Sequence, residues 1–119
     1  MEFQLVLADS EVGRITAADG GLRVELAAAA VLGGGWLQGL VLVLDDATST
    51  HDGAAFGRLA EGQVRVDGHV VTTLSPPATP DGDVELALRF AGGGSLAARG
   101  RRLRLLLAAD ARFNEDLSC

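Results

Sequence analysis

Alternation of apolar and polar residues dominates this chain, and it predicts β-strands. The clearest run covers residues 84–90, where every second residue is a large apolar one, and a similar run covers residues 22–26. Successive side chains of a strand point to opposite faces, so a period of two places one face against a core and the other toward water. Together with other short apolar runs, this pattern predicts strands at residues 3–7, 12–17, 22–30, 36–44, 57–60, 63–66, 69–74, 84–90, 95–98 and 103–108.

Turn signals separate most of these runs. Asp-Gly dipeptides stand at four places, and glycine triplets at two: 19–20, 52–53, 67–68 and 81–82, then 33–35 and 92–94. Asp-Gly between alternating runs is a strong hairpin signal, because a tight reversal needs positive φ, which Gly adopts without cost and Asp tolerates. We also predict a turn at residues 9–11, a polar loop at 47–53, a reversal at 61–62 and a proline-rich loop at 75–80.

These patterns predict an all-β protein: a single antiparallel β-sandwich or small β-barrel of about eight to ten short strands. Its length of 119 residues suits one domain over residues 1–119, and we expect residues 114–119 to form a flexible tail. The alternative is an α+β fold, with helix at residues 22–32 or in the last quarter, because the Ala27–Ala30 run favours helix by propensity.

Two features of the pattern go beyond single strands. The run Leu40–Leu44 is unbroken Leu and Val, which predicts a strand covered on both faces, or one whose outer face meets a partner. In addition, Asp-Gly, an alternating strand, a glycine triplet and another strand occur twice, from residues 19 and 81. An internal duplication would produce this echo, and biased composition would also produce it by chance.

Composition narrows the classes of function. The formal net charge is −6, which argues against nucleic-acid or anionic-membrane binding. All ten basic residues are Arg, which together with the abundant Ala, Gly and Leu indicates a GC-rich bacterial source. A single cysteine, Cys119, cannot form an internal disulfide and is expected to be inert. The longest apolar stretch, residues 26–32, is too short to cross a bilayer, and the N-terminus lacks the features of a secretory signal, so we predict a cytoplasmic protein.

No group of residues predicts catalysis, a metal or a cofactor. Asp45, Asp46, His51 and Asp52 carry metal-ligand chemistry but have no recognised ligand spacing, and turn formation explains them better. Residues 92–97 match a dinucleotide-binding fingerprint only formally, because that motif requires a helix and the following residues predict strand. The histidines are not paired with a nucleophile by position, so we lean against an enzyme.

One basic cluster stands out in this acidic chain: Arg99, Arg101, Arg102 and Arg104. Such a cluster can grip a carboxylate-rich partner, and we single it out as a partner-binding surface. An exposed strand face, with charge that deters edge-to-edge pairing and arginines paired to nearby acids, is the simpler explanation. The sequence favours a non-catalytic protein-interaction module, as a homodimer or an inhibitor- or immunity-like protein. The alternative is a β-barrel that binds a small apolar ligand, with or without enzymatic activity.

Overall fold

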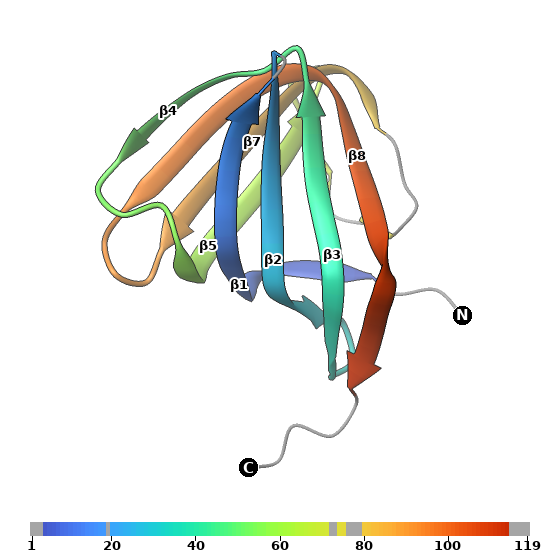
Figure 1. Cartoon of the computed structure of the whole chain (residues 1–119). Helices are drawn as coiled ribbons and strands as arrows, with labels where there is room; N and C mark the ends of the chain where they lie inside the picture. Colours follow the sequence, from blue (N-terminus) through green and yellow to red (C-terminus); the bar gives the residue numbers. More distant parts are fainter. Residues whose placement is uncertain (1–3, 19, 72–73, 76–79, 115–119) are drawn as a thin grey trace.

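The computed structural model describes residues 4–18, 20–71, 74–75 and 80–114, and it confirms the all-β prediction. Six antiparallel strands close into a barrel in the order β1-β2-β3-β8-β7-β5, and β5 returns to β1 (Figure 1). Two further strands attach to it: β4 pairs with β8, and β6 pairs with β5. The strands are β1 (Leu5–Ala18), β2 (Gly21–Val31), β3 (Trp36–Asp45), β4 (Thr48–Asp52), β5 (Gly57–Val66), β6 (His69–Val71), β7 (Asp81–Phe90) and β8 (Ser95–Asn114).

Leucine and valine side chains occupy the barrel interior. Leu40, Leu42 and Leu44 of β3 point inward and are at most 1% exposed, so the predicted covered strand lies in the barrel wall. Val41 stands outside this core cluster and is still only 7% exposed, because β2 and β8 flank it on either side. A barrel of eight strands is just wide enough for side chains to fill, and six strands enclose less. The interior is therefore a packed core.

Two three-stranded halves make up the barrel, β1-β2-β3 and β5-β7-β8. Their glycine-triplet hairpins have the same hydrogen-bond pattern: the last strand residue donates to the carbonyl four residues on and accepts from the amide three residues on. These bonds join Val31 N to Gly35 O and Gly34 N to Val31 O in one half, and Phe90 N to Gly94 O and Gly93 N to Phe90 O in the other. The sequence echo therefore corresponds to two hairpins of one geometry.

The predicted turn at residues 9–11 is wrong, because β1 continues through it as a bulge. Asp9 takes a left-handed φ of 73°, and four residues of β1 stand opposite one residue of β2. Ser10 is fully buried there, and its hydroxyl donates to Val6 O (2.6 Å) and accepts from Ala30 N (2.9 Å). The side chain thus replaces ladder bonds that the bulge removes.

Two predicted connections were also wrong. The predicted loop at 47–53 contains β4, which continues β3 in the same register along β8: Asp45 lies opposite Arg102, and Thr48 opposite Arg99. The predicted reversal at 61–62 lies inside β5. Gly62 is needed for a close approach, since a Cβ there would lie 2.5 Å from Leu7 Cβ.

The two strands predicted at 95–98 and 103–108 are one long strand, β8, which arches over the barrel and changes partner along its length (Figure 1). This strand runs to Asn114, the first residue of the predicted tail, and residues 115–119 lie outside the described part. Among the described residues there is no helix, so the α+β alternative is wrong.

Candidate functional site

The predicted arginine cluster lies on β8, where the structure divides it into paired and unpaired residues. Arg99 forms a salt bridge with Asp83, with 3.0 Å between Nε and Oδ1. Arg104 binds Asp45 through two contacts, Nη2 to Oδ1 at 2.9 Å and Nε to Oδ2 at 3.1 Å. Two of the four positive charges are therefore neutralised within the chain.

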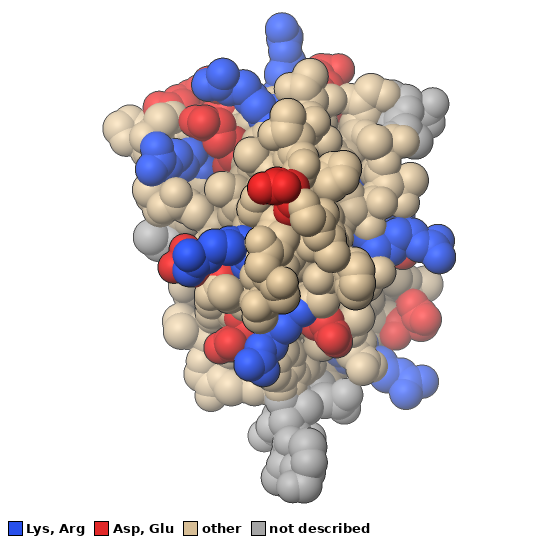
Figure 2. Space-filling view, turned by 90° about the vertical axis from the view of Figure 1, so that its left-hand side faces the viewer, with Lys and Arg blue, Asp and Glu red and all other residues tan. Residues whose placement is uncertain are grey.

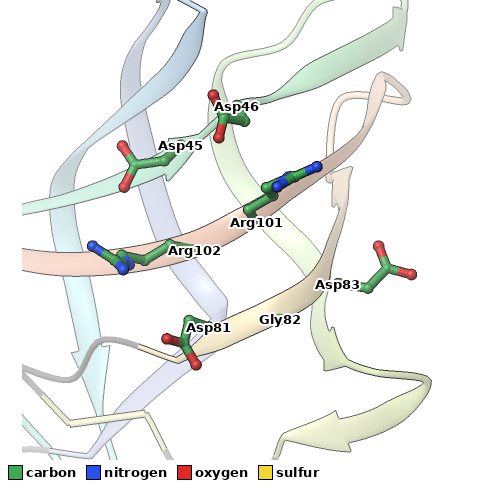
Figure 3. Close-up of a pocket in the computed structure, with 8 residues that line it drawn as sticks. Asp45, Asp46, Asp81, Gly82, Asp83, Arg101 and Arg102 are labelled. Atoms are coloured by element: carbon green, nitrogen blue, oxygen red, sulfur yellow. The ribbon is translucent and has the colours of Figure 1, made fainter.

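The other two arginines line an open depression of about 890 Å³ that they share with four aspartates. Arg102 lies opposite Asp45 on β3 and opposite Asp81 on β7, and Figure 3 shows it between them while Arg101 points away. Among the described residues, neither Arg101 nor Arg102 forms a salt bridge or a side-chain hydrogen bond. Because carboxylates surround both, the depression has mixed charge and is not a basic patch.

The surface around β4 has the same mixed character. Figure 2 views the side of the molecule that carries β4, and it shows basic and acidic side chains close to one another around a mostly uncharged middle that itself carries an acidic side chain. Neighbouring opposite charges cancel at distances beyond the Debye length, about 8 Å at physiological salt. This face therefore offers no long-range attraction for a highly charged partner.

A second cleft, which the sequence reasoning missed, lies between β1 and β4. It has a volume of about 560 Å³, and its floor is made by the core residues Leu22 and Leu96, with Ile15 beside them. Phe56 stands at this cleft and is 66% exposed, the largest exposed fraction of any large hydrophobic residue in the described chain. An exposed aromatic ring beside an apolar floor is a typical mark of a binding surface.

The cleft is open because two strand edges have no partner there. In the described chain β4 pairs only with β8. β1 pairs with β5 only at Glu11 and Val12, which leaves the following residues of β1 paired on the β2 side alone. The connection from β4 to β5 carries Phe56 and lies between these edges without forming a strand. Both edges therefore present backbone groups that no neighbouring strand satisfies.

A few polar side chains also reach this cleft. Ser49 and His51 lie opposite Ala98 and Leu96, which are buried, so strand alternation places both on the core side of β4. Both are nevertheless exposed, since nothing covers that side of β4. Arg14 also lines the cleft; it lies opposite Glu25 on β2 and has no ion-pair partner among the described residues. The described lining of the cleft contains no carboxylate.

This arrangement offers an apolar floor and a few polar groups to a bound molecule. Within the described residues, Ser49 and His51 share no hydrogen bond. No group of three or more His, Cys, Asp or Glu residues in the described chain could hold a metal ion. Asp45, which we interpreted with Asp46 and Asp52 as a turn former, is partly exposed, and the other two are exposed. Cys119 lies outside the described residues.

No family model, curated protein or solved structure matches this chain. Within the part of the chain that the structure describes, no helix is long and apolar enough to cross a membrane.

Proposed function

We propose that this protein is a non-catalytic binding module that takes up a segment of another protein at the cleft between β1 and β4. The observation that carries this proposal is the exposed ring of Phe56 above an apolar floor, between two unpaired strand edges. The segment belongs to a partner protein or to a second copy of the chain. The cytoplasm remains the predicted location.

The energetics favour binding at this cleft over the arginine depression. Complete burial of a Phe side chain is worth about 1.5–3 kcal/mol, and Phe56 has most of its surface still to bury. By contrast, exposed ion pairs typically contribute about 0–1 kcal/mol each. Arg101 and Arg102 are therefore better suited to orient a partner than to hold it, and we retain them as candidate rim contacts.

The alternative function, binding of a small apolar ligand, is supported by the same cleft and not by the barrel interior. Core side chains fill that interior. The cleft, in contrast, joins an apolar floor to polar groups from Arg14 and His51, and its volume is within the range of small-molecule sites, about 300–1,000 Å³. A small amphipathic molecule would fit such a site, although it would leave the two strand edges unpaired.

Three measurements separate these functions. A display library of random ten-residue peptides is selected against the wild-type protein, and the enriched pool is retested on Phe56→Ser. The matched control is Leu32→Ser, because Leu32 is 61% exposed in the hairpin loop between β2 and β3, outside the cleft. A thermal-shift screen of small apolar molecules and light scattering are run in parallel.

The proposal predicts enriched peptides that lose binding to Phe56→Ser and keep it to Leu32→Ser. A light-scattering dimer that Phe56→Ser dissociates also supports it, with a second copy as the occupant. Thermal stabilisation by small apolar molecules without any peptide enrichment supports the alternative. Peptides that bind Phe56→Ser as well as wild type contradict the proposed location.

A further inference from the structure

The geometry points to an extended, acidic peptide segment of a partner protein as the occupant of the cleft, added as a strand to the free edge of β4. This inference rests on the proposed function and specifies how the segment binds and what its side chains are. Strand edges, alternation and charge each support it.

The free edge of β4 is suited to strand addition. The strand is extended over five residues, Thr48–Asp52, and pairs on one side only. Natural sheets usually protect such edges with Lys, Pro, a bulge or a very short strand. β4 contains no Lys or Pro, and its register with β8 has no bulge. The other attached strand, β6, has only three residues. β4 is thus the less protected of the two.

Alternation along β4 defines the side chains that a bound strand would need. Ser49 and His51 face the cleft, while Thr48 and Thr50 lie opposite the exposed residues of β8 and face outward. A strand added beside β4 also presents every second side chain to the cleft. Large apolar residues at those positions would reach Ile15 and the floor. The expected segment therefore has a period of two, with its apolar residues directed inward.

Charge complementarity makes the segment acidic. The described lining of the cleft holds Arg14 and His51 and no carboxylate, although the whole chain carries a net charge of −6. Glu25, which lies opposite Arg14 on β2, pairs with Arg23. The Arg14 guanidinium therefore keeps no ion-pair partner among the described residues and favours a carboxylate within hydrogen-bonding reach. A basic segment would meet Arg14 as a like charge, which is unfavourable.

The same pattern argues against β4 of a second copy as the occupant. That strand reads Thr-Ser-Thr-His-Asp and would bring no large apolar side chain to the floor. A self-paired β4 would leave Ile15 and Phe56 uncovered, although covering them supplies most of the expected binding energy. We therefore assign the cleft to a different chain.

The first test reverses the charge in the cleft. Peptides enriched on the wild-type protein are measured by fluorescence anisotropy against Arg14→Glu, with Arg65→Glu as the control, since Arg65 is exposed on β5 and outside the cleft. We expect acidic, alternating peptides whose affinity falls about tenfold or more on Arg14→Glu, equivalent to about 1.4 kcal/mol, and is unchanged on Arg65→Glu. Replacing the peptide's acidic residues with Lys should restore binding to Arg14→Glu.

The second test examines strand pairing directly. The best peptide is N-methylated at one position at a time, which removes one backbone donor. Addition to a single edge predicts that methylation at alternate positions abolishes binding while the intervening positions tolerate it.

Four results would overturn the inference. They are peptides without charge preference, N-methylation effects without alternation, enriched helical patterns with apolar residues every three or four positions, and a dimer as the sole complex. If such peptides still depend on Phe56, the proposed function stands and only this inference fails. If no peptide is enriched, the inference is contradicted; if in addition no dimer forms that Phe56→Ser dissociates, the proposed function itself fails.

Discussion

Leu44 of β3 and Leu103 of β8 lie directly opposite each other, and both are essentially fully buried. Each stands nine residues after the last glycine of its triplet (35 to 44, and 94 to 103). The two three-stranded halves therefore meet about this pair as approximate two-fold equivalents. After Leu44, the chain passes from β3 into β4, and β4 pairs with the first part of β8 in the register that β3 began. After Leu103, β8 pairs with β3 alone. β4 is thus the extension of β3 past the Leu44–Leu103 pair. In the described chain no strand pairs with the edge of β4 that faces away from β8.

Adjacent residues of β3 should respond oppositely to the same substitution. Leu42 is 1% exposed in the core, so Leu42→Asp buries a carboxylate without a partner and should prevent folding or solubility. Val43 lies on the outer face opposite Arg23 of β2 and Arg104 of β8, so Val43→Asp gains opposite charges and should remain folded. Circular dichroism and soluble yield measure both variants, and a soluble, folded Leu42→Asp would mean that β3 is not a core strand.

The bulge in β1 should depend on one hydroxyl. Ser10→Ala removes both the donor to Val6 O and the acceptor for Ala30 N, and so leaves two backbone groups without their partner. We expect the free energy of unfolding to fall by about 1–3 kcal/mol. Ser49→Ala, at an exposed position of β4, should change it by less than about 0.5 kcal/mol. Urea denaturation measures both, and equal effects would contradict the role assigned to Ser10.

The second glycine triplet contains one essential and one replaceable glycine. A Cβ added at Gly94 would overlap the backbone carbonyl of Ala54, in the connection that carries Phe56, whereas one at Gly92 would meet nothing within 4 Å. Gly94→Ala should therefore lower the free energy of unfolding by about 1–3 kcal/mol. Gly92→Ala should leave it unchanged or raise it by up to about 1 kcal/mol. Thermal denaturation compares the pair, and a reversed order would show that the connection does not pack on this hairpin.

The paired and unpaired arginines of β8 should differ in their contribution to stability. Arg104 holds Asp45 through two contacts with both side chains partly exposed, so Arg104→Ser should cost about 0.5–1 kcal/mol at low salt and less at high salt. Arg102 has no such partner in the described chain, and Arg102→Ser should be neutral within about 0.5 kcal/mol. Chemical denaturation at two salt concentrations checks this, and a larger loss for Arg102→Ser would assign it a structural role.

The sequence predicted those parts of the fold that depend on local pattern. The alternation in β2 and β7 identified both strands, and it correctly outweighed the helix propensity of Ala27–Ala30. β4 was missed because Thr48–Asp52 has no apolar residue and resembles a loop; only its register along β8 makes it a strand. The choice of barrel over sandwich depended on a brief pairing of β1 with β5, at two residue pairs that no local signal marks.

The sequence did not predict the candidate site, because no local signal marks contacts between distant parts of the chain. Ile15 and Leu22 lie on the paired strands β1 and β2, but Phe56 and Leu96 come from two distant parts of the chain and join them only in the folded barrel. None of these residues was singled out from the sequence; the one local signal available was a large aromatic residue, Phe56, directly after a polar loop. The sequence identified the arginine cluster, but it did not predict the ion pair of Arg104 with Asp45, because the two residues are 59 positions apart in the chain.

Hydrogen–deuterium exchange of the backbone amides, with and without a selected peptide, tests most directly whether recognition occurs at the edge of β4. Peptide binding should slow exchange at residues 48–52 and leave exchange at residues 101–104 unchanged. Slower exchange centred on residues 101–104, with residues 48–52 unaffected, would contradict this prediction and assign recognition to the depression around Arg101 and Arg102.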